Sequence, residues 1–165
     1  MDVTDRLGFP LLASGQAQKE ILHNEALLIV DMLVGGVVEE PPRNAPPTSP
    51  AAGQAWIVGM SPSGAWAGKA GQMAGYTAGG WRFVIPTDGL TLLVKSTGTF
   101  AIRRGSDWDL GEVRAAKIVV GGQQVVGAQA AAIPAPTGGA TVDAEARSAI
   151  AAILAALRGH GLITT

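Results

Sequence analysis

The chain of 165 residues contains no cysteine, few charged residues and no long apolar run. Without cysteine it can form no disulfide, thiolate metal site or thiol nucleophile. Charged residues make up 15% of the chain and the formal net charge is −1, so it lacks the basic surface typical of nucleic-acid binding. Its apolar runs, such as residues 26–30, are far shorter than the ~20 residues that span a bilayer. The first residues also lack the basic and apolar regions of a signal peptide. We therefore expect a protein that is made in the cytoplasm and binds neither nucleic acid nor membrane.

Small residues dominate instead. The chain contains 28 Ala and 23 Gly, together 51 of its 165 residues. Since alanine buries little apolar area, a large core of the kind that big enzymes build is not expected. The length suits one domain, or one domain with appendages.

The first zone, residues 1–40, predicts an extended arm and a helix over residues 16–34, with Ser14 as its N-cap. The helix carries an apolar stripe that we expect to attach the protein to a partner, and its main residues are Ile21, Leu28 and Met32. The second zone, residues 41–53, begins with a segment that holds half of the ten prolines. Such a segment is typical of an extended, stiff spacer, although a peptide ligand is the alternative interpretation.

The third zone, residues 54–113, contains seven of the eight aromatic residues and alternates short apolar stretches with glycine turns. This pattern predicts a small antiparallel sheet or barrel. The expected strands cover residues 54–58, 72–76, 81–85, 91–95, 99–103 and 108–111. Only four charged residues lie between positions 44 and 100, so we expect a partner to cover part of this surface.

The fourth zone, residues 114–165, predicts a hairpin over 117–126, an Ala/Pro/Gly linker over 130–140 and a helix that starts after Asp143 and ends before Gly159. A helix of ~16 residues is marginal alone and must pack on something, either its own sheet or copies of itself. Its apolar residues repeat at spacings of 4, 3 and 4, which indicates a seam between helices of several copies. The predicted oligomerisation residues are Ala146, Ile150, Ile153 and Leu157. The expected fold is α+β, a small antiparallel β module flanked by an N-terminal and a C-terminal helix.

Groups able to perform catalysis are scarce. The two histidines, His23 and His160, have no second ligand at a convincing metal-binding spacing. Asp107 and Asp109 flank Trp108 as paired carboxylates do in glycosidases, but this stretch also fits a hairpin turn followed by a core tryptophan. We therefore expect no enzyme, no cofactor and no metal.

Four tryptophans could instead stack on sugar rings, or they could form the core of a sheet that has few Leu and Ile residues. Trp66 lies between glycines and is the expected exposed ring. The candidate carbohydrate-binding residues are Trp66, Tyr76 and Asp107.

Several stretches resemble the DUF2793 family, proteins of alphaproteobacterial prophages and gene transfer agents. The resemblance covers roughly residues 7–110 and rests on residues 11–19, 23–27, 46–50, 56–59, 64–68 and 79–83 and on Pro86. Residues 142–150, Leu154, residues 157–158 and residues 161–163 resemble a C-terminal segment of phage head- and tail-fibre proteins.

The resemblance implies a structural virion protein, the base or adaptor of a head spike or tail fibre used in host attachment. The implied partners are further copies of the chain in a trimer or pentamer, other capsid or tail proteins, and a distal fibre protein. The implied location is the virion, after assembly in the bacterial cytoplasm. The alternative is a carbohydrate-binding module that itself recognises host surface polysaccharide.

Overall fold

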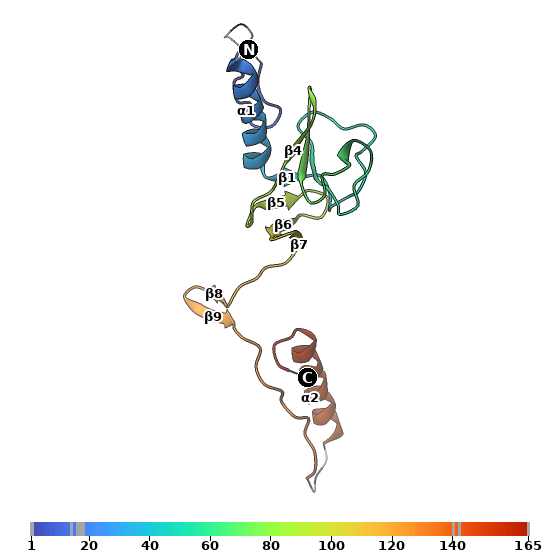
Figure 1. Cartoon of the computed structure of the whole chain (residues 1–165). Coiled ribbons are helices and arrows are strands. Elements are labelled where there is room, and N and C mark those ends of the chain that lie inside the picture. The colour runs from blue at the N-terminus through green and yellow to red at the C-terminus, as the bar shows by residue number, and fades with distance from the viewer. Residues whose placement is uncertain (1, 14, 16–18, 140, 142, 165) are drawn as a thin grey trace. The chain divides into compact units, whose positions relative to one another are not determined.

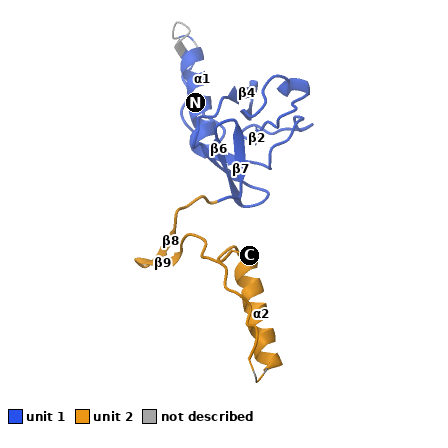
Figure 2. Cartoon of the chain, turned by 60° about the horizontal axis from the view of Figure 1, so that its bottom comes forward, with its two compact units in different colours: residues 1–112 blue, residues 113–165 orange. Residues whose placement is uncertain are grey.

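The computed structural model describes residues 2–13, 15, 19–139, 141 and 143–164. It divides the chain into two compact units, residues 1–112 (unit 1) and residues 113–165 (unit 2), shown in two colours in Figure 2. The predicted cap Ser14 and the predicted first helical residues 16–18 lie outside the described part of the chain.

Unit 1 begins with an arm that folds back on itself, since Val3 and Pro10 form an antiparallel bridge. Helix α1 (Lys19–Gly35) follows and ends where the Gly35-Gly36 pair predicts, with Gly36 at a φ of +54°. Directly after it, β1 (Val37–Val38) pairs in parallel with a later strand. This strand was not predicted, because two residues are too short for a periodicity to show.

Two sheets form the β module, and all six predicted strands are present with bounds shifted by at most one residue (Figure 1). The first sheet contains β2 (Ala55–Ile57), β3 (Met73–Thr77) and β4 (Gly80–Val84), all antiparallel. The second has the order β1-β5-β6-β7, with β5 (Thr91–Val94), β6 (Thr99–Arg104) and β7 (Asp107–Leu110) antiparallel to one another. The tight turn between β3 and β4 requires a φ of +93° at Gly80, which glycine adopts without strain.

The three-stranded sheet carries a core on each of its faces, because successive side chains of a strand point to opposite sides. On one face Ile57 and Met73 pack with Met32 of α1, and with buried residues of β1, β5 and β6. On the other face Trp56 and Ala74 pack with Trp66, which is delivered by the short 3-10 helix η1 (Gly64–Trp66). Unit 1 therefore buries an aliphatic and an aromatic cluster on opposite sides of one sheet.

The proline-rich segment, expected as a spacer, is hydrogen-bonded to the rest of unit 1. The Arg43 backbone donates to Ile57 O and accepts from Gly59 N, at 3.1 and 2.7 Å, in a parallel bridge to Val58. The Asn44 side chain accepts a bond from Ser61 N at 3.0 Å. The proline-rich stretch thus lies along an edge of the β module, where proline is tolerated because no further strand needs its missing N–H group.

Unit 2 contains a two-stranded sheet, β8 (Ile118–Val120) and β9 (Gln123–Val126), and helix α2 (Ala144–Gly159). Together with unit 1 this confirms the expected α+β fold, with antiparallel sheets and a helix at either end of the chain. The predicted helix end is off by one residue: Gly159 still belongs to α2, His160 is the C-cap, and Gly161 takes the positive φ of 69°.

Candidate functional site

Helix α2 presents its predicted seam to solvent. The carboxylate of Asp143 accepts a hydrogen bond from Ala146 N at 2.8 Å, which confirms the predicted N-cap. In the seam, Ile150 is 42% exposed and Ile153 is 59% exposed, whereas Leu157 is half-buried. Leu154 is the one residue of α2 that is buried. Helix α2 thus has a capped N-terminus, but most of its side chains are exposed to solvent.

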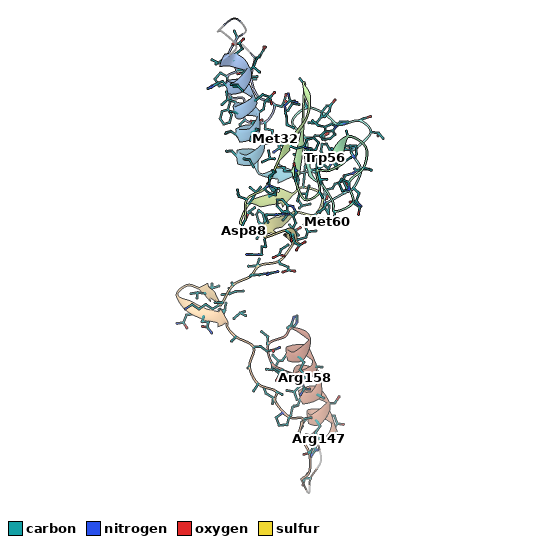
Figure 3. The ribbon with its side chains drawn as sticks, viewed as in Figure 1. Met32, Trp56, Met60, Asp88, Arg147 and Arg158 are labelled. Carbon is teal, nitrogen blue, oxygen red and sulfur yellow. The ribbon has the colours of Figure 1, made fainter. Side chains whose placement is uncertain are left out.

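The chain's own linker runs along a different side of α2, held by two arginines of the helix (Figure 3). Arg158 donates to Ile133 O at 2.8 Å, and Arg147 donates to the carbonyl oxygens of Pro136 and Gly138. Near the end of the helix, Ala130 pairs with the buried Ile163. These contacts explain why Leu154 is buried, and they leave the Ile150 and Ile153 side chains uncovered.

The predicted attachment stripe of α1 is buried in the protein's own core only at its C-terminal end. Met32 is 4% exposed and packs so closely on Gly75 of β3 that a Cβ there would lie 3.0 Å from Met32 Cγ, and closer still to its Sδ and Cε. Leu28 is half-buried, and only Ile21 is exposed. Met32 is therefore not available to an outside protein. An amphipathic pattern cannot tell whether the apolar face meets the chain's own sheet or a partner.

Polar side chains on α1 fix the helix to unit 1. The Asn24 amide exchanges two hydrogen bonds with the backbone of Leu12, at 2.9 and 3.0 Å. Glu25 accepts two bonds from Arg82 of β4, at 2.6 and 2.7 Å. These bonds lower the pKa of the Glu25 carboxyl. Asn24 and Glu25 thus hold α1 in place on unit 1, while the neighbouring His23 is exposed.

The opposite side of α1 remains exposed and apolar. The exposed apolar side chains there are Leu22, Ala26, Val30 and Val34, and His23 lies beside them. They repeat every four residues, so they form one row along the helix surface. No carboxylate or lysine interrupts that row.

A buried polar cluster that sequence reasoning missed joins the arm to α1. The carboxylate of Asp31, 3% exposed, accepts from Thr4 Oγ1 at 2.9 Å, Arg6 N at 3.0 Å and Leu7 N at 2.6 Å. The Arg6 guanidinium donates to the carbonyl oxygens of Gly53, Met32 and Val37. Burial lowers the pKa of Arg6, and the nearby Asp31 and Glu39 charges oppose that shift. The signal was a single acidic residue inside the apolar stretch 26–34.

Four aromatic rings pack against one another on the outer face of the three-stranded sheet. Trp66 lies 5.1 Å from Trp81 and 6.3 Å from Trp56, measured between ring centroids, and Tyr76 lies 5.0 Å from Trp81. The expectation that Trp66 is exposed is wrong, because η1 turns its ring inward and leaves it 0% exposed. Trp66 thus offers no ring face to a sugar, while Tyr76 is half-buried.

Asp107 lies elsewhere, at the mouth of a pocket of about 360 Å³ in unit 1. The polar lining comes from Asn44, Ser106 and Asp107, and the apolar lining includes Met60 and the ring of Trp108. The Trp108 Nε1 donates to Gly71 O at 3.0 Å, which fixes the ring. The three predicted carbohydrate residues are therefore not brought together, since Trp66 and Tyr76 belong to the aromatic cluster.

We also examined the described residues for metal sites and membrane-spanning helices. In that part of the chain, no three histidine, aspartate or glutamate side chains lie close enough together to hold a metal ion. None of its helices is long and apolar enough to cross a membrane.

Comparison with known proteins identifies the central part of the chain. The model of a family described as "Protein of unknown function (DUF2793)" matches residues 23–109, which is 87 of the 165 residues. No curated protein matches the chain.

Proposed function

The chain belongs to the DUF2793 family, and from that premise we propose that it is a non-enzymatic structural protein of a phage-like particle. It forms a homo-oligomer that serves as the base or adaptor of a head spike or tail fibre in host attachment. Its other partners are capsid or tail proteins on one side and a distal fibre protein on the other. It assembles in the bacterial cytoplasm and ends in the virion.

The observation that carries this proposal is the uncovered seam of α2. A lone helix of this length is marginal in water, and tertiary packing normally stabilises it. Here the chain itself buries one residue of α2, while Ile150 and Ile153 stay exposed one helical turn apart. Packing the same seam from several copies would remove these side chains from water, and isoleucine at both positions favours more than two helices.

The sequence resemblances support the virion assignment. The C-terminal stretch that resembles phage head- and tail-fibre proteins is the stretch that forms α2 and its seam. A homo-oligomeric fibre or spike would cover the apolar seam of α2 with the seams of other copies.

The experiment tests the seam and the location separately. Native mass spectrometry of the purified full chain should give a trimer or pentamer, and Ile150→Asp with Ile153→Asp should convert it to monomer. The matched control is Ser148→Asp with Ala152→Asp, which adds the same two charges to the opposite side of α2 and should leave the oligomer intact. Immunolabelling of purified particles should then detect the wild-type protein. A monomer at high concentration, together with absence from particles, would overturn the proposal.

A second candidate function, binding of host polysaccharide, is favoured by the pocket beside Asp107. It combines an ordered tryptophan ring with carboxylate, amide and hydroxyl groups, the groups that bind sugars. The pocket predicts that the purified protein binds glycans on an array and that Asp107→Ala abolishes this binding. The control Asp2→Ala removes an exposed carboxylate away from the pocket and should bind as wild type. An array with no bound glycan would rule this function out and leave the structural role untouched.

A further inference from the structure

The β8–β9 hairpin of unit 2 is a two-stranded sheet without further strands. In the part of the chain that the structure describes, β8 and β9 pair only with each other. An isolated two-stranded hairpin is marginally stable at best in water, and stability normally requires a third strand or a covering layer. Each strand therefore has one edge of unpaired backbone groups.

The side chains of the hairpin are uncharged and exposed. Residues 118–126 include no charged residue and no proline, the two kinds of residue that usually protect a free edge from pairing. All seven strand residues are exposed. Because side chains alternate along a strand, Val119 points to one face of the hairpin and Ile118 and Val120 point to the other. Each face of the hairpin thus carries exposed valine or isoleucine side chains beside one glutamine, Gln123 on one face and Gln124 on the other, and neither face carries a charge.

The turn determines which backbone groups point outward. Gly121 and Gly122 have φ of +56° and +80°, as a two-residue hairpin turn requires. Val120 and Gln123 flank the turn, so they form the hydrogen-bonded pair of the hairpin. The next pair, Val119 with Gln124, directs its N–H and C=O groups away from the partner strand, and the regular pairing ends there, because the register shifts between Val119 and Ile118. β8 and β9 each present a donor and an acceptor at their outer edges.

We propose that hairpins of successive copies pair edge to edge, β9 of one copy with β8 of the next, into one closed intermolecular sheet. This inference rests on the homo-oligomer of the proposed function and adds a second interface to it. The two edges differ, so pairing is head-to-tail, and rotation about a common axis closes such a chain of contacts into a ring. All neighbouring strands are then antiparallel, and a ring has no free edges.

A second copy fits these edges better than a foreign protein for two reasons. The hairpin carries no charge, so identical copies approach without bringing like charges together and no oppositely charged partner is selected. The hairpin also lies in the same unit as the α2 seam. Association of α2 holds several hairpins at high effective concentration, which compensates for the short strands.

The test places a charge on each edge strand of the full chain. Val119→Lys and Val125→Lys change exposed valines of β8 and β9, a substitution that blocks edge pairing while leaving a hairpin able to form. The matched control is Val113→Lys, the same change at a valine that is exposed and lies outside the strands. The hairpin variants should assemble about tenfold more weakly than wild type in native mass spectrometry, and the control should not differ from wild type.

Hydrogen exchange distinguishes edge pairing from packing of the apolar faces. In the wild-type oligomer, the outward amides of Val119 and Gln124 should exchange slowly, and in the Ile150→Asp, Ile153→Asp monomer they should exchange at unprotected rates. Fast exchange of both amides in the oligomer would overturn the inference. So would hairpin variants that assemble as well as the control.

Failure of this inference differs from failure of the proposed function. If the α2 variant abolishes the oligomer while the hairpin variants and the two amides behave as unpaired, the homo-oligomer stands and the intermolecular sheet is rejected. If wild type is a monomer under all conditions, the proposed function fails as well.

Discussion

The two units of the chain solve the problem of burial in different ways. Unit 1 holds all eight aromatic residues and buries fully the side chains of Trp66, Ile57, Met73 and Leu92. Unit 2 holds no aromatic residue, and its only buried large side chains are Leu154 and Ile163 among the residues described. A chain segment of this kind cannot offset the entropy of ordering its backbone from its own core. Unit 1 thus has a substantial core of its own, whereas unit 2 has little, and the proposed homo-oligomer would supply the burial that unit 2 lacks.

Among the changes considered, removal of Arg6 should destabilise unit 1 most. Arg6→Ala leaves the carbonyl oxygens of Gly53, Met32 and Val37 without their donor. Hydrogen bonds to charged groups contribute about 1.5–3 kcal/mol each, so we expect the three lost bonds to cost about 4–5 kcal/mol in total. Urea unfolding followed by tryptophan fluorescence measures this, because all four tryptophans lie in unit 1.

Arg6→Lys is the matched variant for that prediction. A lysine keeps the charge but cannot reach three separate carbonyl oxygens as a guanidinium does, so it should recover less than half of the loss. Full recovery by lysine would show that charge alone, and not the fork of donors, holds the arm.

The close packing of α1 on β3 gives the next largest effect. Gly75→Ala forces Met32 to move, and overpacking of this kind costs about 1–3 kcal/mol. Met32→Ala removes a buried side chain and costs about 2–4 kcal/mol. In the double variant the new methyl group occupies space that Met32 vacates, so the double loss should be smaller than the sum, by about 1 kcal/mol. Additive losses would mean that α1 is not packed on β3 in solution.

The Glu25–Arg82 pair should have the smallest effect on the stability of unit 1, and this effect should depend on pH. Bonds from Arg82 lower the pKa of Glu25 in the folded chain, so this pair stabilises unit 1 above the unfolded pKa of the carboxyl and stops doing so as the pH falls through the lowered value. Both side chains are partly exposed, so the contribution at pH 7 is only about 0.5 kcal/mol. Glu25→Gln should lower stability by that amount at pH 7 and by less at pH 3. A difference that does not change with pH would contradict the role of the pair.

Sequence reasoning predicted the local features of both units well. The glycine turns, the six strands of the β module, the hairpin of unit 2 and the Asp143 cap all depend on residues a few positions apart. It missed features that depend on distant residues, such as the bonds of Asp31 to an arm more than 20 residues away. It also placed Trp66 on the surface, since nothing local reveals that η1 turns the ring toward Trp81. The direction of Met32 was missed for the same reason.

Hydrogen exchange of the full chain at two concentrations tests whether unit 1 folds by itself and unit 2 only in the oligomer. The low concentration is one at which native mass spectrometry gives mostly monomer, and the high concentration one at which it gives mostly oligomer. The account predicts that amides of α1 and of β2 to β7 are equally protected in both samples, whereas amides of α2 and of the β8–β9 hairpin are protected only in the oligomer. Equal protection of α2 and the hairpin in the monomer would contradict it, because unit 2 would then be stable without other copies.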